Sequence, residues 1–420
     1  MKNYRELTCC RICEGNFYPE TIRLKDSPLA NELYLSKEEA INADLFPLEV
    51  VECESCKHIQ LKHIVDPERL FSNYVYASGT SKTFRDHFTK LARKLSDVVP
   101  GGLVLEVGSN DGTLLEALTS HGMRAIGVEP SHQLAEISKE KCEAVYTNFL
   151  DRELSDFLVK EYGDFDFVVG NNVFAHIDDL VGAFKIAQTI LKQGGYLVFE
   201  VAHALKLVEH KLFDTIYHEH MSYHTVISID IFIRKLGFNI TDVEEIEMHG
   251  GSIRVTCQKS ASQSEMLPEV KEIFRREVLA GLDSSDWMKK FSRHLDQLSI
   301  ETKNAIQTEP NGTTWFGYGA PAKAVTFINQ FELDQIGLVG IIDDNPGKQG
   351  RFLPRSGIEV VSHAEMEFNL IPTLNPTNLN CVIFPWNLSA EIASKLVGFS
   401  KYALKVIWFL PSYKEVVPTK

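Results

Sequence analysis

The sequence has no long apolar run and no block of charges of one sign. Its first residues, MKNYRELTCC, contain no apolar segment of the kind that directs secretion. No stretch approaches the ~18 consecutive apolar residues that a membrane-spanning helix needs. We therefore expect a cytoplasmic protein with no membrane partner. The formal net charge of −14 is spread over 420 residues without a basic cluster, which argues against a nucleic-acid partner.

Two common motifs that would indicate a function are absent from the segments that most nearly resemble them. The first glycine-rich turn, residues 108–112, is not the G-x-G-x-x-G pattern that binds dinucleotides. The histidine-rich stretch 214–224 lacks the H-E-x-x-H spacing of zinc proteases. The chain also has no low-complexity tract, and its hydrophobic content of 44% is ordinary for a globular protein. This length allows two or three domains with large buried cores.

Four cysteines near the start of the chain form two C-x₂-C pairs: Cys10, Cys13, Cys53 and Cys56. In a reducing compartment, paired cysteines of this spacing favour one tetrahedral zinc site over disulfides. Zinc with four thiolates has no open position, so the ion would be structural. A redox dithiol is the competing interpretation, and Cys9, His58 and His63 lie close enough in sequence to be alternative ligands.

A doubly wound α/β pattern follows the cysteine-rich segment. Short buried strands alternate with amphipathic helices, which is typical of a parallel sheet. The expected strands are 103–107, 124–129, 166–169 and 196–200. One helix is expected to begin at about Thr113, and two others to cover 133–141 and 178–192. We expect a non-helical insertion over 203–225 and further β structure over 237–257.

A second α/β series closes the chain. Residues 265–306 are charged and helical and predict a long connector. A strand over 315–318 then runs into a glycine turn and a helix, as in a Rossmann-like domain. We therefore predict three domains with these boundaries: a zinc-binding domain over 1–75, a doubly wound α/β domain over 76–260, and the connector plus a C-terminal Rossmann-like domain over 261–420.

The first glycine turn predicts a cofactor site. Glu106 ends a strand, and Gly108 and Gly112 let the backbone approach a ligand at the carboxyl end of the sheet. Glu129 ends the next strand, where a carboxylate can accept both hydroxyls of a ribose. An adenosine-bearing cofactor without a pyrophosphate fits this pattern, which points to S-adenosylmethionine; a plain βα turn is the alternative. The expected cofactor-binding residues are Glu106, Gly108, Asn110, Asp111, Gly112, Glu129 and Asn171.

The stretch from Asp214 to His224 is dense in histidine, tyrosine and glutamate. Burying so many polar and titratable side chains costs free energy, so the cluster indicates an active site. A neutral imidazole is the natural general base for a carbon acid, and phenol or carboxyl neighbours can orient it or hydrogen-bond an enolate. His176 follows another strand and is expected on the same face. A partly buried structural network and a second metal site remain as alternatives.

Taken together, these motifs resemble the C-3 methyltransferases that act on nucleotide-linked 4-keto-deoxysugars. The matching pieces span nearly the whole chain in the family's order: Cys10/Cys13/Cys53/Cys56, Tyr74–Ser81, Glu106–Gly112, Tyr217–His220, His249–Arg254 and Gly317–Lys323. The resemblance implies an N-terminal zinc domain, a central S-adenosylmethionine domain, and a C-terminal Rossmann-like domain that helps to hold the nucleotide-sugar.

The resemblance also implies roles for individual residues. His220 would remove the proton at C3 of the sugar, with Tyr217, Glu219 and His176 as its companions. The enolate formed beside the 4-keto group would attack the methyl of S-adenosylmethionine. The expected substrate-binding residues are Tyr74, Tyr76, Ser78, Thr80, Arg254 and Lys323; for the first four, an ordinary aromatic linker is the alternative, and Lys323 could simply cap a helix.

Two competing functions remain at this stage. A sugar O- or N-methyltransferase would not need a carbon acid, and a non-catalytic zinc-dependent nucleotide-sugar binding protein would consume no S-adenosylmethionine. We expect a nucleotide-linked sugar, with thymidine diphosphate as the nucleotide, to be the partner of a monomer or small homo-oligomer. The sequence does not identify the sugar itself.

Overall fold

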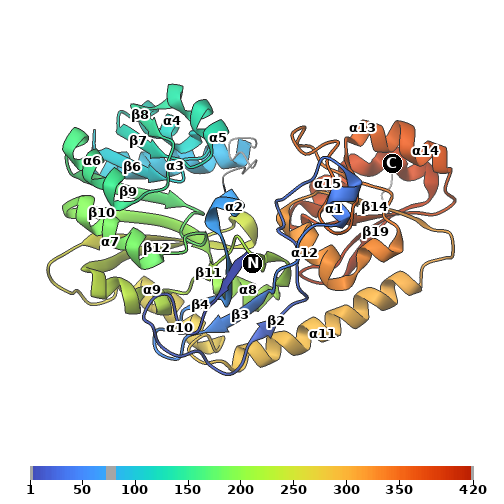
Figure 1. The fold of residues 1–420 in the computed structure, drawn as a ribbon, viewed down its shortest axis with the longest axis horizontal. Coiled ribbons are helices and arrows are strands. Elements are labelled where there is room, and N and C mark those ends of the chain that lie inside the picture. The colour runs from blue at the N-terminus through green and yellow to red at the C-terminus, as the bar shows by residue number, and fades with distance from the viewer. Residues whose placement is uncertain (1–2, 72–81, 418–420) are drawn as a thin grey trace.

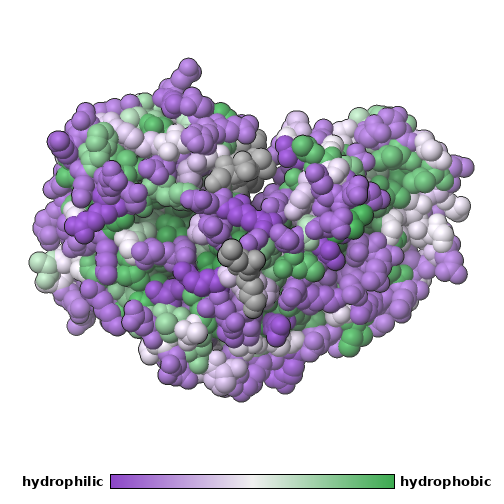
Figure 2. Space-filling model, viewed as in Figure 1, coloured by the Kyte–Doolittle hydropathy of each residue, from purple (hydrophilic) through white to green (hydrophobic). Residues whose placement is uncertain are grey.

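The computed structural model describes residues 3–71 and 82–417 of the chain. It forms two lobes that are joined along one side by the N-terminal segment and by a long helix (Figure 1). In the space-filling view, a notch separates the two lobes at the top (Figure 2). Four expected substrate residues, Tyr74, Tyr76, Ser78 and Thr80, lie outside the described residues.

The larger lobe is built on a seven-stranded sheet of order β12-β13-β10-β9-β6-β7-β8. Five strands are parallel, as the sequence predicts: β6 (Leu103–Val107), β7 (Arg124–Val128), β8 (Ala144–Tyr146), β9 (Phe165–Asn171) and β10 (Leu191–Ala202). The other two, β12 (Phe238–Ile246) and β13 (Ser252–Lys259), form an antiparallel hairpin on the β10 edge. The hairpin lies where further β structure was expected over 237–257, and its two strands run antiparallel because a short turn can only join antiparallel strands.

Helices cover both faces of this sheet. Alternate residues of β6 point to opposite sides, so Leu103 and Leu105 join one core while Val104 joins another. The first core also receives α6 (Arg152–Tyr162), α7 (Leu180–Ile190), α9 (Val226–Ile233) and α10 (Pro268–Leu279), and the second receives α3 (Lys82–Val98) and α4 (Thr113–Ser120). The remaining helix, α5 (His132–Ser138), connects β7 and β8. This layering leaves the carboxyl ends of β6, β7 and β9 together at one rim.

The N-terminal segment forms its own small sheet, and the catalytic stretch predicted from the sequence contributes to it. The order is β11-β4-β3-β2, where β2 is Ile22–Arg23, β3 is Glu49–Glu52, β4 is Ile59–Leu61 and β11 is Ser222–Tyr223. A separate pair joins β1 (Tyr4–Glu6) to β5 (His63–Val65), and two short helices are α1 (Lys37–Ile41) and α2 (Pro67–Phe71). Since β11 pairs with β4 in antiparallel register, residues just after His220 are part of the N-terminal sheet.

The insertion between β10 and β11 contains a helix that the sequence analysis did not anticipate. Residues Ala204–His210 form α8, although 203–225 was expected to be non-helical. Its buried side chains, Ala204, Leu205 and Leu207, follow helical spacing that the surrounding histidines mask in the sequence. The rest of the insertion is mostly turns, and this irregular part carries Tyr217 to His220.

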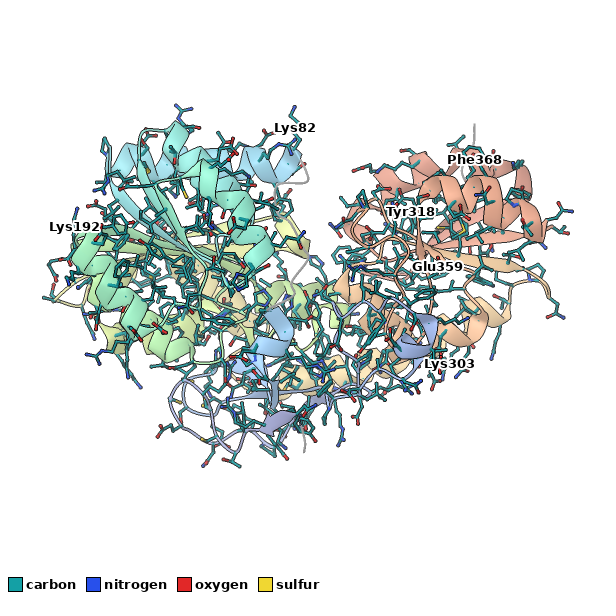
Figure 3. All side chains as sticks on the ribbon, turned by 45° about the horizontal axis from the view of Figure 1, so that its top comes forward. Lys82, Lys192, Lys303, Tyr318, Glu359 and Phe368 are labelled. Carbon is teal, nitrogen blue, oxygen red and sulfur yellow. The ribbon has the colours of Figure 1, made fainter. Side chains whose placement is uncertain are left out.

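The smaller lobe is a second α/β unit. Its six-stranded sheet has the order β16-β15-β14-β17-β18-β19, with β14 (Thr314–Tyr318), β15 (Ile341–Ile342), β16 (Val360–Val361), β17 (Leu379–Ile383) and β18 (Leu404–Trp408) parallel and β19 (Lys414–Val416) antiparallel. Its helices are α12 (Ala322–Phe331), α13 (His363–Glu365), α14 (Ile371–Leu374) and α15 (Ser389–Lys395). Figure 3 shows Tyr318, Glu359 and Phe368 within this lobe, with Lys82 and Lys192 in the other.

The N-terminal unit, the insertion, the connector and the smaller lobe share one hydrophobic core. It includes Val50 from β3, Phe213 from the insertion and Phe327 from α12. The connector helix α11 (Asp286–Gln307) adds Trp287, whose indole Nε1 donates to Glu52 Oε2 at 2.7 Å. This continuity excludes a picture in which the metal unit is an independent module. Within residues 3–71 and 82–417, no helix combines the length and apolar character that crossing a membrane requires.

A buried carboxyl joins the insertion to the smaller lobe. Asp214 is 2% exposed, and its Oδ2 accepts a hydrogen bond from Trp386 Nε1 at 3.0 Å. Trp386 also packs closely on the β12–β13 turn, since a Cβ at Gly250 would lie 3.1 Å from its ring. Burial raises the pKa of Asp214 to about 6, although Lys323 and the indole hydrogen bond oppose the rise.

This carboxyl predicts a pH-dependent stability. The unfolded chain has an aspartate pKa of about 3.9, so the raised folded pKa means that the folded state holds the proton more tightly. Stability should therefore fall as pH rises from about 4 to about 6, by about 3 kcal/mol in total. We expect Asp214→Asn to raise the thermal midpoint relative to wild type more at about pH 8 than at about pH 5. The exposed Asp286→Asn is the control, and equal shifts at both pH values would contradict the assignment.

Candidate active site and metal centre

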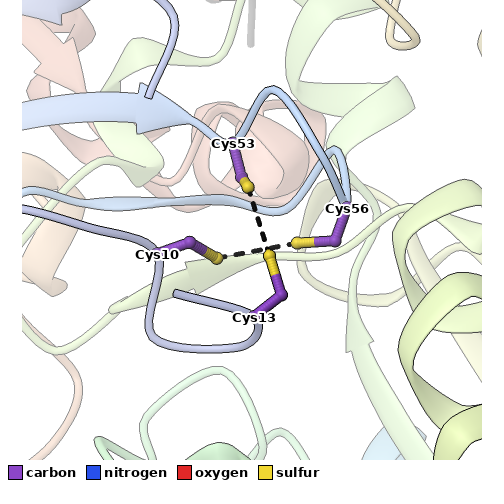
Figure 4. Close-up of side chains that lie close together, drawn as sticks. All are labelled: Cys10, Cys13, Cys53 and Cys56. Atoms are coloured by element: carbon purple, nitrogen blue, oxygen red, sulfur yellow. Dashed lines mark hydrogen bonds between the residues drawn. The ribbon is translucent and has the colours of Figure 1, made fainter. Parts of the chain in front are cut away.

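The four cysteines predicted as metal ligands come together. Their sulfur atoms all lie within 4.8 Å of one another, with Cys10 Sγ 3.6 Å from Cys56 Sγ and Cys13 Sγ 3.4 Å from Cys53 Sγ (Figure 4). A disulfide would need about 2.05 Å, whereas thiolates at about 2.3 Å from one zinc ion lie about 3.8 Å apart. The sulfur set therefore fits a structural zinc.

The alternative ligands considered from the sequence take no part in this cluster. His58 Nε2 lies 3.2 Å from Ser222 Oγ, and the ring is fully buried. His63 packs edge-on against Tyr4, with ring centroids 5.6 Å apart. Cys9 is not among the grouped cysteines of the described chain.

The first glycine turn has the shape that close approach of a ligand requires. Gly108 and Gly112 have φ of +67° and +74°, and Asn110 also has a positive φ of +51°. A Cβ on Gly112 would lie 2.6 Å from Ser138 Cβ, so the turn could not carry a side chain there. The turn is braced by Glu129, whose Oε2 accepts from Asn110 N and whose Oε1 accepts from Ser131 N, both at 2.8 Å.

Several buried polar atoms around this turn have no hydrogen-bond partner in the described part of the chain: Glu106 Oε2, Ser109 Oγ, and both side-chain atoms of Asn171. A buried unpaired polar group costs about 1–3 kcal/mol, so such a group indicates a missing ligand. Burial, then the charges of Asp111 and Glu129, raise the pKa of Glu106 well above its usual value. Three converging carboxyl groups fit a cationic, hydrogen-bonding cofactor such as the sulfonium predicted from the sequence.

The predicted catalytic residues also come together. His176, in the loop after β9, donates from Nδ1 to the carbonyl of Glu219 at 2.6 Å. The His176 and His220 rings lie 5.2 Å apart between centroids. Because Asn171 ends the same strand that leads to His176, the histidine pair and the glycine turn lie at the same rim of the sheet. Burial lowers the pKa of His176, which favours the neutral imidazole.

Tyr217 and His220 form a hydrogen-bonded pair with a defined tautomer. His220 Nδ1 lies 2.8 Å from the Thr215 carbonyl, which can only accept, so Nδ1 carries the proton. His220 Nε2 then accepts from the Tyr217 hydroxyl at 2.7 Å. The pair can take up one proton at Nε2, and the phenol can donate to an oxygen of a bound molecule.

Glu219 is held by a residue of the N-terminal unit that the sequence analysis missed. Its Oε1 accepts from Asn31 Nδ2 at 2.9 Å and from Asn31 N at 3.3 Å. Its Oε2 is buried without a partner among the described residues, as is the hydroxyl of Tyr223. Burial raises the pKa of Glu219. Nothing in the sequence around Asn31 distinguishes it from an ordinary loop asparagine, because the contact depends on long-range packing.

The other two histidines of the stretch are structural. His218 Nε2 lies 3.3 Å from the Pro47 carbonyl, and its ring packs edge-on against Phe46. His224 Nε2 lies 3.3 Å from the Phe174 carbonyl. Both are fully buried, and burial lowers the pKa of each to about 4. They fix the backbone on either side of His220.

The predicted substrate residues Arg254 and Lys323 already have protein partners. The Arg254 guanidinium donates to Glu200 Oε2 at 3.0 Å and to Glu244 at 3.4 Å. Lys323 Nζ donates to Asn387 Oδ1 at 2.8 Å and lies 4.7 Å from the centre of the Trp386 ring. Their contact with a substrate stays a prediction. Lys323 follows the Gly319 turn at the start of α12, beside the contact between the two lobes.

Three family models match successive parts of the chain. Residues 10–71 match a model described as "Putative zinc binding domain", residues 81–243 match "Methyltransferase domain", and residues 247–411 match "C-methyltransferase C-terminal domain". The three matches follow one another along the chain in this order, and the domain boundaries given above stay a prediction.

Three individual proteins are similar to all or part of the chain. The chain is 28% identical over 392 residues to the C-methyltransferase NovU of Streptomyces niveus, and the match covers 92% of each protein. It is 32% identical over 101 residues to a ubiquinone biosynthesis O-methyltransferase of Coxiella burnetii, which covers 24% of this chain and 43% of that protein. The magnesium protoporphyrin IX methyltransferase of Synechocystis PCC 6803 aligns with 42% of this chain and 79% of its own, with 15% identity and a TM-score of 0.32. Of these three proteins, NovU is matched along nearly the whole of both chains.

The closed thiolate cluster predicts a stability effect of the metal. We expect Cys53→Ser to bind less zinc and to lower the thermal midpoint by about 5–10 °C, since losing a structural metal costs several kcal/mol of folding free energy. Metal analysis and a thermal melt measure both effects. Cys9→Ser is the matched control and should keep the zinc and the midpoint. A zinc-depleted Cys53→Ser protein that melts like wild type would contradict a structural role.

Proposed function

Because the chain belongs to the family of S-adenosylmethionine-dependent C-methyltransferases, we propose that it methylates C3 of a nucleotide-linked 4-keto-deoxysugar. We further propose thymidine diphosphate as the nucleotide. The observation that carries the proposal is the Tyr217–His220 pair beside His176 and Glu219, at the rim where the glycine turn lies. A carbon acid needs a base, and an O- or N-methyltransferase would not need this pair to form a carbanion.

In this proposal His220 is the base. The 4-keto group acidifies the C3–H bond, and His220 Nε2 takes that proton because Nδ1 is already protonated against the Thr215 carbonyl. The enolate carbon would then bond to the donor methyl group as the S–CH3 bond breaks, which regenerates the 4-keto group and releases S-adenosylhomocysteine. His220 finally returns the proton to solvent after the product leaves.

Tyr217 has two roles in succession. Without substrate its hydroxyl donates to His220 Nε2, which keeps that lone pair occupied. When the sugar binds, the hydroxyl turns to the keto oxygen and stabilises the developing enolate, which leaves Nε2 open for the C3 proton. His176 and the unpartnered Oε2 of Glu219 complete the polar wall of the site. The raised pKa of Glu219 favours a protonated carboxyl that can donate to a sugar oxygen.

S-adenosylmethionine supplies the methyl group when bound. Glu106, Asp111 and the unpartnered amide of Asn171 are the residues that we assign to its positive charge and polar groups, and Glu129 can offer second lone pairs to a ribose. The main-chain turn from Gly108 to Gly112 provides the close approach. Holding the two substrates together supplies much of the rate.

The other predicted substrate-binding residues are assigned to the nucleotide part of the substrate. We assign the nucleotide to the notch between the lobes, near Lys323, with Arg254 and the segment that contains Tyr74, Tyr76, Ser78 and Thr80 as further contacts. The three functional units are taken as residues 1–75, 76–260 and 261–420. Four free thiols that bind zinc are compatible with a reducing compartment, which supports a cytoplasmic location.

A panel of thymidine- and guanosine-linked 4-ketosugars tests the function. Mass spectrometry should find a product heavier by one methyl group, with S-adenosylhomocysteine released in equal amount. Nuclear magnetic resonance should place the new methyl on C3. A methyl on oxygen or nitrogen, or binding of the sugar nucleotide with no consumption of S-adenosylmethionine, would reject the proposal in favour of the corresponding rival function.

Solvent exchange tests the base. Without methyl donor, the wild-type enzyme should exchange the C3 proton of its sugar substrate for deuterium. We expect His220→Ala to bind both ligands, which calorimetry measures. Its rates of exchange and of turnover should fall by about 10²–10⁴-fold. His210→Ala, an exposed histidine on α8, is the control and should behave as wild type. Wild-type exchange in His220→Ala would rule out His220 as the base.

A further inference from the structure

Arg11 lies between two of the zinc ligands, and its side chain leaves the metal site to enter the active-site loops. The guanidinium is 5% exposed and makes five hydrogen bonds, which matches its five N–H groups. Nε donates to Gln60 Oε1 at 3.1 Å. The remaining four bonds reach two loops that are far apart in the sequence.

One loop follows His176. Arg11 Nη1 donates to the carbonyls of Ile177 at 3.1 Å and Asp178 at 2.8 Å. The Asp178 carboxylate lies 3.8 Å from the same nitrogen and adds an attractive charge. These bonds hold the backbone immediately after His176.

The other loop follows His220. Arg11 Nη2 donates to the Met221 carbonyl and to Ser222 Oγ, both at 2.7 Å. The same residues enter β11, which pairs with β4 of the N-terminal sheet. Since the two Nη nitrogens belong to one rigid planar group, the backbone after His176 and the backbone after His220 are held at a fixed separation.

The metal site holds the other end of this connection. Arg11 is flanked by Ile12 and by the ligands Cys10 and Cys13, and Cys53 and Cys56 close the shell. Zinc bound to all four thiolates would fix the main chain of the first knuckle and therefore the origin of the Arg11 side chain. The Arg11 guanidinium is charged at neutral pH.

We propose that Arg11 is a positioning residue that connects the zinc site to the histidine pair. It sets the separation of His176 and His220 by holding the loops that carry them, and it does not contact the reacting atoms. The proposal rests on the proposed function for the identity of the reaction. It adds a task for the zinc unit beyond holding its own fold.

Two variants separate positioning from simple folding. Arg11→Gln removes the charge and most donors, and Arg11→Lys keeps the charge but offers only three donors from one nitrogen. We expect each purified full-length variant to keep its zinc, to lower kcat by about 100-fold for Arg11→Gln, and to leave KM close to wild type. Arg11→Lys should recover part of the lost kcat. If Arg11→Gln does not fold, Arg11→Lys alone still decides the outcome.

Hydrogen exchange followed by mass spectrometry gives a readout without substrate. Peptides covering 172–178 and 215–223 should exchange faster in the Arg11 variants, while peptides from the β6–β9 core and the four cysteines keep their wild-type protection. Arg5→Ala is the matched control, because Arg5 also bonds to Asp178, at 2.7 Å, but as an exposed surface pair. It should alter neither the exchange of the second loop nor kcat.

Three outcomes would overturn the proposal: unchanged exchange in both loops, faster exchange throughout the chain, or loss of zinc from Arg11→Lys. Failure of the proposed function is separate and visible in the wild type. If wild-type enzyme methylates no 4-ketosugar of the panel, the reaction assignment is wrong, but the exchange data still decide whether Arg11 holds the two loops.

Discussion

The geometry of the Tyr217–His220 stretch depends on a set of hydrogen bonds to the metal-binding unit. Main-chain pairing of β11 with β4 fixes the residues after His220, and Asn31 fixes Glu219. Arg11 donates to the backbone just after His176 and to the backbone just after His220. The turn that carries Tyr217 to His220 belongs to no long helix or strand, so part of its geometry must come from neighbours. Here those neighbours belong to a unit that is too small to rely on its own core and that zinc can stabilise.

At the rim of the larger sheet, by contrast, several buried polar atoms lack a hydrogen-bond partner within the described residues. Glu106 Oε2, the Asn171 amide and Glu219 Oε2 are buried and lack partners in the described residues. Each costs free energy in the ligand-free chain, and a bound cofactor or sugar that pairs with them recovers that cost. Neighbouring carboxyl groups raise the pKa of Glu106 further, so a cation bound there is favoured over a neutral molecule. The site is thus electrostatically complementary to a sulfonium before any ligand arrives.

The sequence predicted what local chemistry determines and missed what packing determines. The zinc cysteines, the Gly108–Gly112 turn and the Tyr217–His220 pair are visible because their residue types and spacing are constrained by ligand or backbone geometry. The helix α8 was missed, since a short helix carries a weak signal, and the β structure over 237–257 was expected without its antiparallel direction. Asn31 was missed because it is far from Glu219 in the sequence. Nothing in the residues around Asn31 indicates a contact of this kind. The position of Arg11 between two cysteines could be read from the sequence, but its hydrogen-bond partners could not.

The N-terminal unit also reaches the smaller lobe, which constrains how the notch between the lobes can change. Lys25 N donates to Gln330 Oε1 at 2.9 Å, Asn329 Nδ2 donates to the Asp26 carbonyl at 3.0 Å, and the main chains of Tyr34 and Phe352 bond to each other. One unit therefore contacts α12, the loop that carries Phe352, and the catalytic stretch. A rotation of the smaller lobe has to break these bonds or carry the N-terminal unit with it, and in the second case Asn31 would move relative to the larger sheet and pull on Glu219. A rotation of the smaller lobe of this kind would therefore also shift the Glu219 carboxyl, although Glu219 needs no contact with that lobe.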